Sequence, residues 1–90
     1  HSSIIRKNAL IGMGSIILDG AEIGEGAFIG AGSLVPPGKK IPPNSLAFGR
    51  PAQVIRSLTE EDIKDMERIR REYVEKGQYY KQQKPIMPNK

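Results

Sequence analysis

Cysteine is missing from the 90-residue chain, and histidine occurs only once, as His1. Without cysteine these residues can form no disulfide and carry out no thiolate chemistry, and any metal binding through histidine must use His1. No apolar run approaches the roughly 18 residues from which a transmembrane helix is recognised. The composition therefore predicts a soluble, cytoplasmic protein with no membrane-spanning segment.

Acidic residues are fewer than basic ones, because 10 aspartates and glutamates face 14 lysines and arginines and the net charge is +4. A basic balance can indicate nucleic acid or an anionic membrane as a partner. In this chain, however, Arg68 and Arg70 are interspersed with glutamates, as on an ordinary solvated helix face. We therefore predict neither a nucleic-acid partner nor a membrane partner.

A six-residue repeat runs without interruption through residues 5–46. Six of its seven units have Ala or Ser at the fifth position, and only Lys39 departs from this rule. An α-helix cannot use such a repeat, because six steps of about 100° rotate the marked residue by about 240° and scatter it around the axis. The first residue of every unit is a branched aliphatic: Ile5, Ile11, Ile17, Ile23, Ile29, Val35 and Ile41.

A solenoid of short parallel strands accounts for this repeat. If each unit makes one strand and one corner, the opening aliphatic residues point inward and stack from coil to coil. The small fifth residue fits the limited volume beside a corner. Glycine supplies the unusual backbone angles or the close approach that corners demand. We expect these roles at Gly12, Gly14, Gly20, Gly24, Gly26, Gly30 and Gly32.

The pattern resembles the hexapeptide-repeat family of left-handed parallel β-helices, in which three units make one triangular coil. The resemblance implies a mostly β fold with about two to three coils in residues 1–56. The stretch LAFGRPAQVIR at residues 46–56 resembles the exit segment of the same superfamily. Because the repeat phase runs backwards through Ser3 to His1, we expect further coils before His1 in the intact protein.

A C-terminal α-helix is predicted for residues 57–77, followed by a helix end and tail at residues 78–90. Thr59 suits the N-cap, and Asp62 stands where a capping-box partner is expected. Gly77 is a suitable stop. One apolar stripe should pack this helix along the outer wall of the β-helix. The stripe consists of Ile63, Met66, Ile69 and Tyr73.

The stretch HSSIIRKNALIGMGSIILDGAEIG resembles the region that follows the last metal-binding histidine in γ-class carbonic anhydrases. The resemblance implies that His1 is a ligand of zinc or iron. It also implies two further histidines upstream in sequence and a site shared between the subunits of a homotrimer. By the same resemblance Tyr73 reaches toward the metal site, although its helical spacing also suits ordinary packing.

The leading prediction is the C-terminal part of a γ-carbonic-anhydrase-like lyase that interconverts carbon dioxide and bicarbonate by metal-bound hydroxide. Three neutral imidazoles leave the metal acidic enough to bring bound water to a pKa near 7, but this chain lacks two of the three. Two alternatives stay open. One is a hexapeptide acyltransferase with a catalytic histidine and an acyl-CoA groove between subunits. The other is a non-catalytic trimeric scaffold that has lost the ligands.

Overall fold

Short strands recur every six residues in the computed structural model, which describes residues 2–75. Each strand joins the last residue of one repeat unit to the first residue of the next. The predictions for His1, for the helix stop at Gly77 and for the tail at 78–90 lie outside the described residues. The seven two-residue strands are β1 (Ile4–Ile5), β2 (Leu10–Ile11), β3 (Ile16–Ile17), β4 (Glu22–Ile23), β5 (Phe28–Ile29), β6 (Leu34–Val35) and β7 (Lys40–Ile41).

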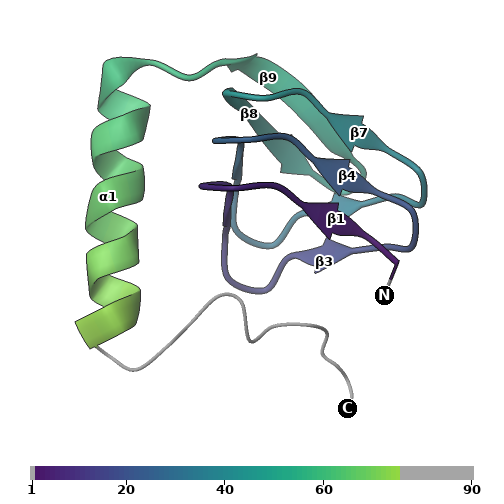
Figure 1. Cartoon of the computed structure of the whole chain (residues 1–90), viewed down its shortest axis with the longest axis horizontal. Coiled ribbons are helices and arrows are strands. Elements are labelled where there is room, and N and C mark those ends of the chain that lie inside the picture. The colour runs from purple at the N-terminus through teal and green to yellow at the C-terminus, as the bar shows by residue number, and fades with distance from the viewer. Residues whose placement is uncertain (1, 76–90) are drawn as a thin grey trace.

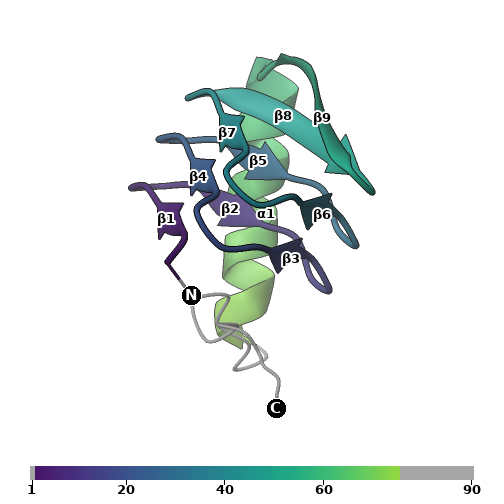
Figure 2. The same cartoon turned by 90° about the vertical axis from the view of Figure 1, so that its right-hand side faces the viewer.

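Strands one coil apart pair in parallel and build three flat walls. The first wall contains β1, β4 and β7, and it pairs Ile5 with Ile23 and Ile23 with Ile41. The second wall contains β2, β5 and β8 (Ser45–Gly49), and the third contains β3 and β6. Every parallel pair is offset by 18 residues, so one coil holds three units, as predicted. Figure 2 shows the coils stacked on one another.

The second residue of each of these strands forms the core. In the second coil Ile23, Ile29 and Val35 are completely buried, each worth roughly 1.5–3 kcal/mol relative to an exposed side chain. Ile5 was expected to be equally inward but is 45% exposed. It belongs to the first coil and stacks only on Ile23. The inward assignment is therefore confirmed in the middle of the stack and is wrong in degree at Ile5.

One residue in every unit, always the fourth, has a positive φ angle. This residue is glycine in five units, but it is Asn8 (φ 64°) in the first unit and Asn44 (φ 55°) in the last. Glycine adopts this left-handed conformation freely, and asparagine is among the few other residues that tolerate it. The sequence identified glycine at the corners but did not identify the two asparagines.

Gly12 and Gly24 have a different role, because they lie where two coils approach closely. A Cβ atom on Gly12 would lie 2.4 Å from the backbone nitrogen of Ala31 in the next coil. A Cβ atom on Gly24 would lie 2.5 Å from the nitrogen of Pro43. Packing between coils, and not the φ angle, therefore excludes a side chain at these two positions.

The exit segment folds back as an antiparallel hairpin at the end of the second wall. β9 (Ala52–Ser57) pairs with β8 from Gly49–Ala52 to Ser45–Ser57, and the Arg50–Pro51 peptide is cis. Ala47 and Ala52 are completely buried and extend the core into the hairpin. The antiparallel pairing was not foreseen, because the six-residue period carries no information beyond Leu46.

The helix α1 (Glu60–Glu75) runs along the second wall, as Figures 1 and 2 show. Just before the helix, the Leu58 amide donates to the Asn44 carbonyl of the third coil at 3.0 Å. Near the other end, the Arg70 guanidinium donates to the Asn8 carbonyl of the first coil. The helix therefore spans the whole stack, which confirms the predicted packing. No helix in residues 2–75 is long and apolar enough to cross a membrane.

The apolar stripe predicted for α1 is only partly correct. Met66 is 3% exposed, while Ile69 and Tyr73 are half-buried. Ile63, in contrast, is 47% exposed, and the neighbouring Asp62 takes the buried position at 8%. The helix presents Asp62 to the interior because its carboxylate has partners on the hairpin and at the helix start. The placement of Ile63 against the wall is therefore corrected.

Candidate functional site

Tyr73, predicted to lie near a metal site, is held against a corner of the first coil. It is half-buried near the end of α1, and the backbone of Met13 hydrogen-bonds its phenol. Met13 belongs to the turn between β2 and β3, which is the corner between the second and third walls. The fold thus brings Tyr73 to the Gly12–Met13–Gly14 corner.

Burial raises the pKa of the Tyr73 phenol. The hydrogen bond from the Met13 backbone acts in the opposite direction, and the negative charge of Glu72 adds a further increase. The phenol therefore stays protonated at neutral pH. In that state it can donate a hydrogen bond, but it cannot act as a general base.

Arg70 lies three residues before Tyr73, so the two side chains share one face of α1. Its guanidinium reaches the Asn8 carbonyl at the corner between the first and second walls. Together, Arg70 and Tyr73 attach the C-terminal half of α1 to both edges of the second wall. The sequence alone predicted a solvated helix face for Arg70 and did not indicate this contact. Asn8, which takes the place of a corner glycine, was the available signal for the corner but not for its partner.

The third corner of the coil lies away from α1. Asp19 follows β3 there, in a turn, and its carbonyl accepts a hydrogen bond from the Gly38 amide at 3.0 Å. In the sequence Asp19 follows His1 by 18 residues, which is the length of one coil. His1 itself lies outside the described residues. β3 separates the Met13 corner, where Tyr73 lies, from the Asp19 corner. Tyr73 and Asp19 therefore occupy opposite edges of the third wall.

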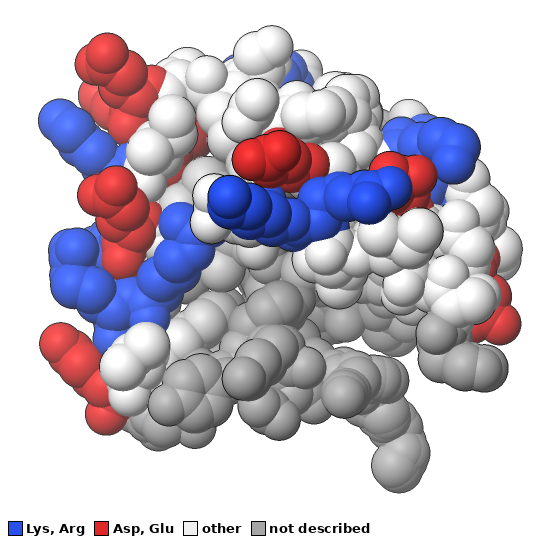
Figure 3. Space-filling model, viewed as in Figure 1, with Lys and Arg blue, Asp and Glu red and all other residues white. Residues whose placement is uncertain are grey.

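The first wall carries a ladder of charged side chains, one from each coil. Glu22 accepts Arg6 at 2.9 Å and Lys40 at 3.4 Å. The hydrogen bond from Arg6, followed by that from Lys40, lowers the pKa of the Glu22 carboxyl. On the face viewed in Figure 3, basic and acidic side chains are likewise interleaved and do not form a patch of one sign. Glu22 is thus engaged by cations and is not poised as a base or metal ligand.

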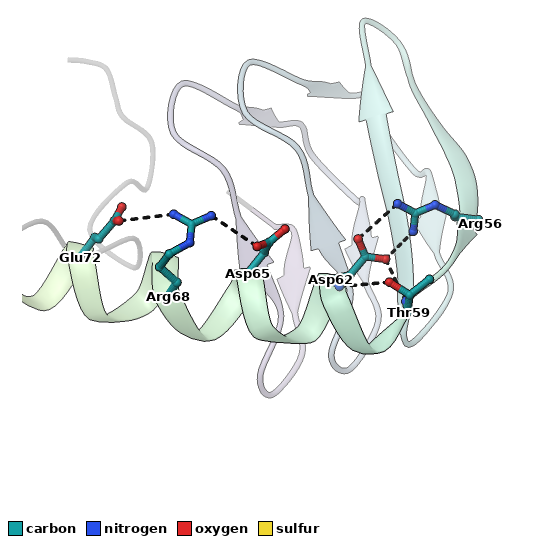
Figure 4. A network of polar contacts seen from close by, with 6 residues as sticks. All are labelled: Arg56, Thr59, Asp62, Asp65, Arg68 and Glu72. Carbon is teal, nitrogen blue, oxygen red and sulfur yellow. Dashed lines mark hydrogen bonds and ion pairs between the residues drawn. The ribbon is translucent and has the colours of Figure 1, made fainter.

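A second charged network holds the start of α1, as Figure 4 shows. Arg56 of β9 forms a two-pronged ion pair with Asp62. Thr59 and Asp62 also exchange hydrogen bonds, from the Thr59 amide to the carboxylate at 2.8 Å and from the Asp62 amide to the hydroxyl at 3.1 Å. The predicted capping box is therefore confirmed. Arg56, and after it the Thr59 backbone, lowers the pKa of Asp62 to about 2.

The described residues do not fit a metal by themselves. Within residues 2–75, no three side chains of histidine, cysteine, aspartate or glutamate come together where they could hold an ion. The carboxylates of Glu22 and Asp62 are already paired with cations. A metal site that involves this chain must therefore take at least one of its ligands from outside residues 2–75.

Comparisons with known proteins agree on the fold. Residues 2–37 match the sequence profile of the family described as bacterial transferase hexapeptide (six repeats). A carbonic anhydrase of Geobacillus kaustophilus (strain HTA426) is 86% identical over 81 residues, which are 90% of this chain and 44% of that protein. These matches confirm the predicted left-handed parallel β-helix followed by a helix.

Two solved structures extend the comparison. A Bacillus cereus protein provisionally assigned as an acetyltransferase is 84% identical, with a TM-score of 0.76, over 90% of this chain and 47% of its own. A galactoside acetyltransferase in complex with coenzyme A is 43% identical, with a TM-score of 0.61, over 68% of this chain and 30% of its own. The chain thus spans less than half the length of each of these relatives. They differ in the activity that their names state.

Proposed function

The chain belongs to the hexapeptide-repeat superfamily, and from that premise we propose that it is part of a γ-carbonic-anhydrase-like enzyme. The intact protein is proposed to interconvert carbon dioxide and bicarbonate as a cytoplasmic homotrimer. The observation that carries the proposal is the 86% identity to a carbonic anhydrase over 81 of the 90 residues.

The extent of that match includes α1 as well as the coils. The match spans 81 of the 90 residues, and the part of the chain left out is shorter than the 16 residues of α1. The galactoside acetyltransferase, in contrast, covers 68% of the chain. The helix does not separate the two activities, however, because the Bacillus cereus protein assigned as an acetyltransferase also matches 90% of the chain.

His1 is the residue of this chain that we propose as a metal ligand. Residues 2–75 contain no group of three side chains that could hold a metal. We therefore propose that the other ligands come from sequence beyond this chain and from a neighbouring subunit. We propose that Tyr73 serves the site of such a neighbour, since α1 holds it at the edge of the third wall away from Asp19. There its protonated phenol would orient a bound molecule by donating a hydrogen bond.

The test compares the intact wild-type protein with its His1→Ala variant. Metal content is measured by elemental analysis, and carbon dioxide hydration is measured on the same samples. We expect His1→Ala to fold, to lose most of its metal and to lose activity with it. Ile63→Ala is the matched control, because Ile63 is exposed on α1 and has no part in the proposed site. Full metal occupancy and unchanged hydration in His1→Ala would exclude the ligand role.

Acetyl transfer is the second candidate, and the 84% identity to the Bacillus cereus protein favours it specifically. The same intact protein should then bind acetyl-coenzyme A, measured by calorimetry, and release coenzyme A when an acceptor is supplied. Binding of acetyl-coenzyme A without carbon dioxide hydration would replace the first proposal by this one. A protein that binds neither metal nor acetyl-coenzyme A would support the non-catalytic scaffold.

A further inference from the structure

β9 is the outer strand of the second wall. Among residues 2–75 it pairs with β8 on one side, and no strand pairs with its other side. It has six residues, whereas each of the strands β1 to β7 has two. Figure 2 shows β9 beside β8 at the outer edge of the sheet. An edge strand of this length presents a row of backbone donors and acceptors that another chain can pair with.

The features that usually protect an edge strand are weak in β9. Proteins protect edges with charged side chains, lysine above all, with proline, or with β-bulges that twist the edge away. β9 contains no lysine or proline, and the charge of its one arginine, Arg56, is paired with Asp62. Its centre is apolar, because Val54 is 42% and Ile55 is 53% exposed. The pairing register shifts between Leu46 and Ala47, and this β-bulge leaves Ile55 without a partner on β8; it is the one protective feature that β9 has.

The order of side chains along β9 is complementary to itself in antiparallel pairing. A twofold axis through Ile55 places Ile55 opposite Ile55 of a second copy, because residues that face each other in an antiparallel pair lie on the same side of the sheet. The same axis places Val54 opposite Arg56, so no like charges face each other and an apolar pair is central. We propose that β9 pairs antiparallel with β9 of a second copy of this chain and joins their second walls into one sheet.

The pairing should be weak and therefore dependent on concentration. Six residues on each side bury much less than the roughly 800 Å² per partner of a standard interface. Each copy carries one such edge, so each copy pairs with one other copy. Two assemblies whose edges pair in this way form a particle of twice the mass. In the proposed homotrimer three edges would act together, which strengthens the association without any new contact. The proposal itself needs only β9 and does not depend on the enzymatic activity.

Sedimentation velocity of the intact protein over a wide concentration range tests the pairing. We expect the wild-type particle to double in mass as concentration rises. Ile55→Lys should stay at the lower mass throughout, because a lysine on each copy would meet at the centre of the pair. Ile63→Lys is the matched control, since it makes the same substitution at a similarly exposed isoleucine on α1. It should double like the wild type.

Circular dichroism verifies that each variant is folded. If Ile55→Lys fails to fold, Ile55→Thr serves in its place, because threonine keeps the β-propensity and removes the apolar contact. A wild type that never doubles would overturn the proposal. Doubling of the Ile55 variants would overturn it too, and so would loss of doubling in Ile63→Lys, because net charge and not β9 would then govern association.

Discussion

Asp62 combines two roles that belong to different levels of the structure. As the capping-box partner of Thr59, it completes the first turn of α1. As the ion-pair partner of Arg56, it ties that turn to β9. Aspartate is shorter than the usual glutamate of a capping box, yet it still reaches the Thr59 amide. One carboxylate therefore sets both where the helix begins and which face it turns inward.

We expect Asp62→Asn to be less stable than the wild type at neutral pH, with a difference that disappears in acid. Folding lowers the pKa of Asp62 from 3.8 to about 2. A depressed pKa means that the stabilisation is fully present above pH 3.8 and is lost as the pH falls through about 2. Thermal unfolding of both proteins over this range measures it. A difference that persists unchanged below pH 2 would contradict the assignment.

Gly12→Ala should destabilise the protein by about 1–3 kcal/mol, because the coils are already in contact there. The added Cβ would lie 2.4 Å from the Ala31 backbone nitrogen. Asn8→Gly is the control, since glycine readily adopts its φ of 64°, and its effect should stay within about 1 kcal/mol. Urea unfolding gives both free energies. If Gly12→Ala matches the wild type, neighbouring coils can separate enough to admit a methyl group.

At the level of elements, the face that α1 turns toward the coils cannot be predicted from the spacing of its apolar residues alone. Leu58 bonds to the third coil and Arg70 bonds to the first. Between these contacts Met66 is buried and Ile63 is exposed, although both belong to the apolar stripe in the sequence. The contacts at the two ends determine the rotation of the helix, and the rotation determines which apolar residues are buried.

Met66→Ala should therefore cost about 2–5 kcal/mol, whereas Ile63→Ala should cost less than about 1 kcal/mol. The reason is that truncating Met66 leaves a cavity under the helix, while Ile63 already faces solvent. The free energy of unfolding in urea distinguishes the two variants. Equal losses would mean that Ile63 packs against the second wall after all, as the sequence alone predicted.

The same reasoning applies to the stacked aliphatic residues of the coils. Ile29→Ala, in the middle coil, should lower the free energy of unfolding by about 2–5 kcal/mol, because Ile29 is completely buried. Ile5→Ala should cost clearly less, since nearly half of Ile5 is exposed. Thermal and urea unfolding of both variants give the comparison. A larger loss at Ile5 would show that a further layer covers it in the protein under test.

At the level of the whole molecule, the coils and α1 depend on each other. The strands β1 to β7 have only two residues each, and the outward Leu10 of the second wall is buried where the helix passes. A helix of 16 residues would be marginal by itself in water, so α1 in turn needs the wall. We therefore expect the coil stack and α1 to fold together.

Deleting residues 58–90 should lower the melting temperature and increase the binding of an apolar fluorescent dye, because the second wall loses its cover. Deleting residues 76–90 alone is the control, since it shortens the chain and keeps α1. We expect that control to melt close to the wild type. An equally stable protein without residues 58–90 would show that the coils do not need the helix.

The sequence by itself determined the coil, because a solenoid repeats the same local environment every six residues. Each buried aliphatic, such as Ile23 or Ile29, is specified by its own unit and by its equivalents one coil away. The helix start is equally local, since Thr59 and Asp62 lie three residues apart. For the candidate site, residue patterns alone indicated little. The proposed roles of His1 and Tyr73 came from family resemblance.

Only the tertiary structure decided which side chains meet across long stretches of chain. Arg70 donates a hydrogen bond to the Asn8 carbonyl although 62 residues separate them, and no sequence period relates the two positions. Such contacts determine which face of α1 points inward and why β9 pairs antiparallel with β8. They also place Tyr73 at the Met13 corner. The physical reason is that a repeat encodes its own stacking, whereas the docking of a helix or hairpin depends on partners that the local sequence does not specify.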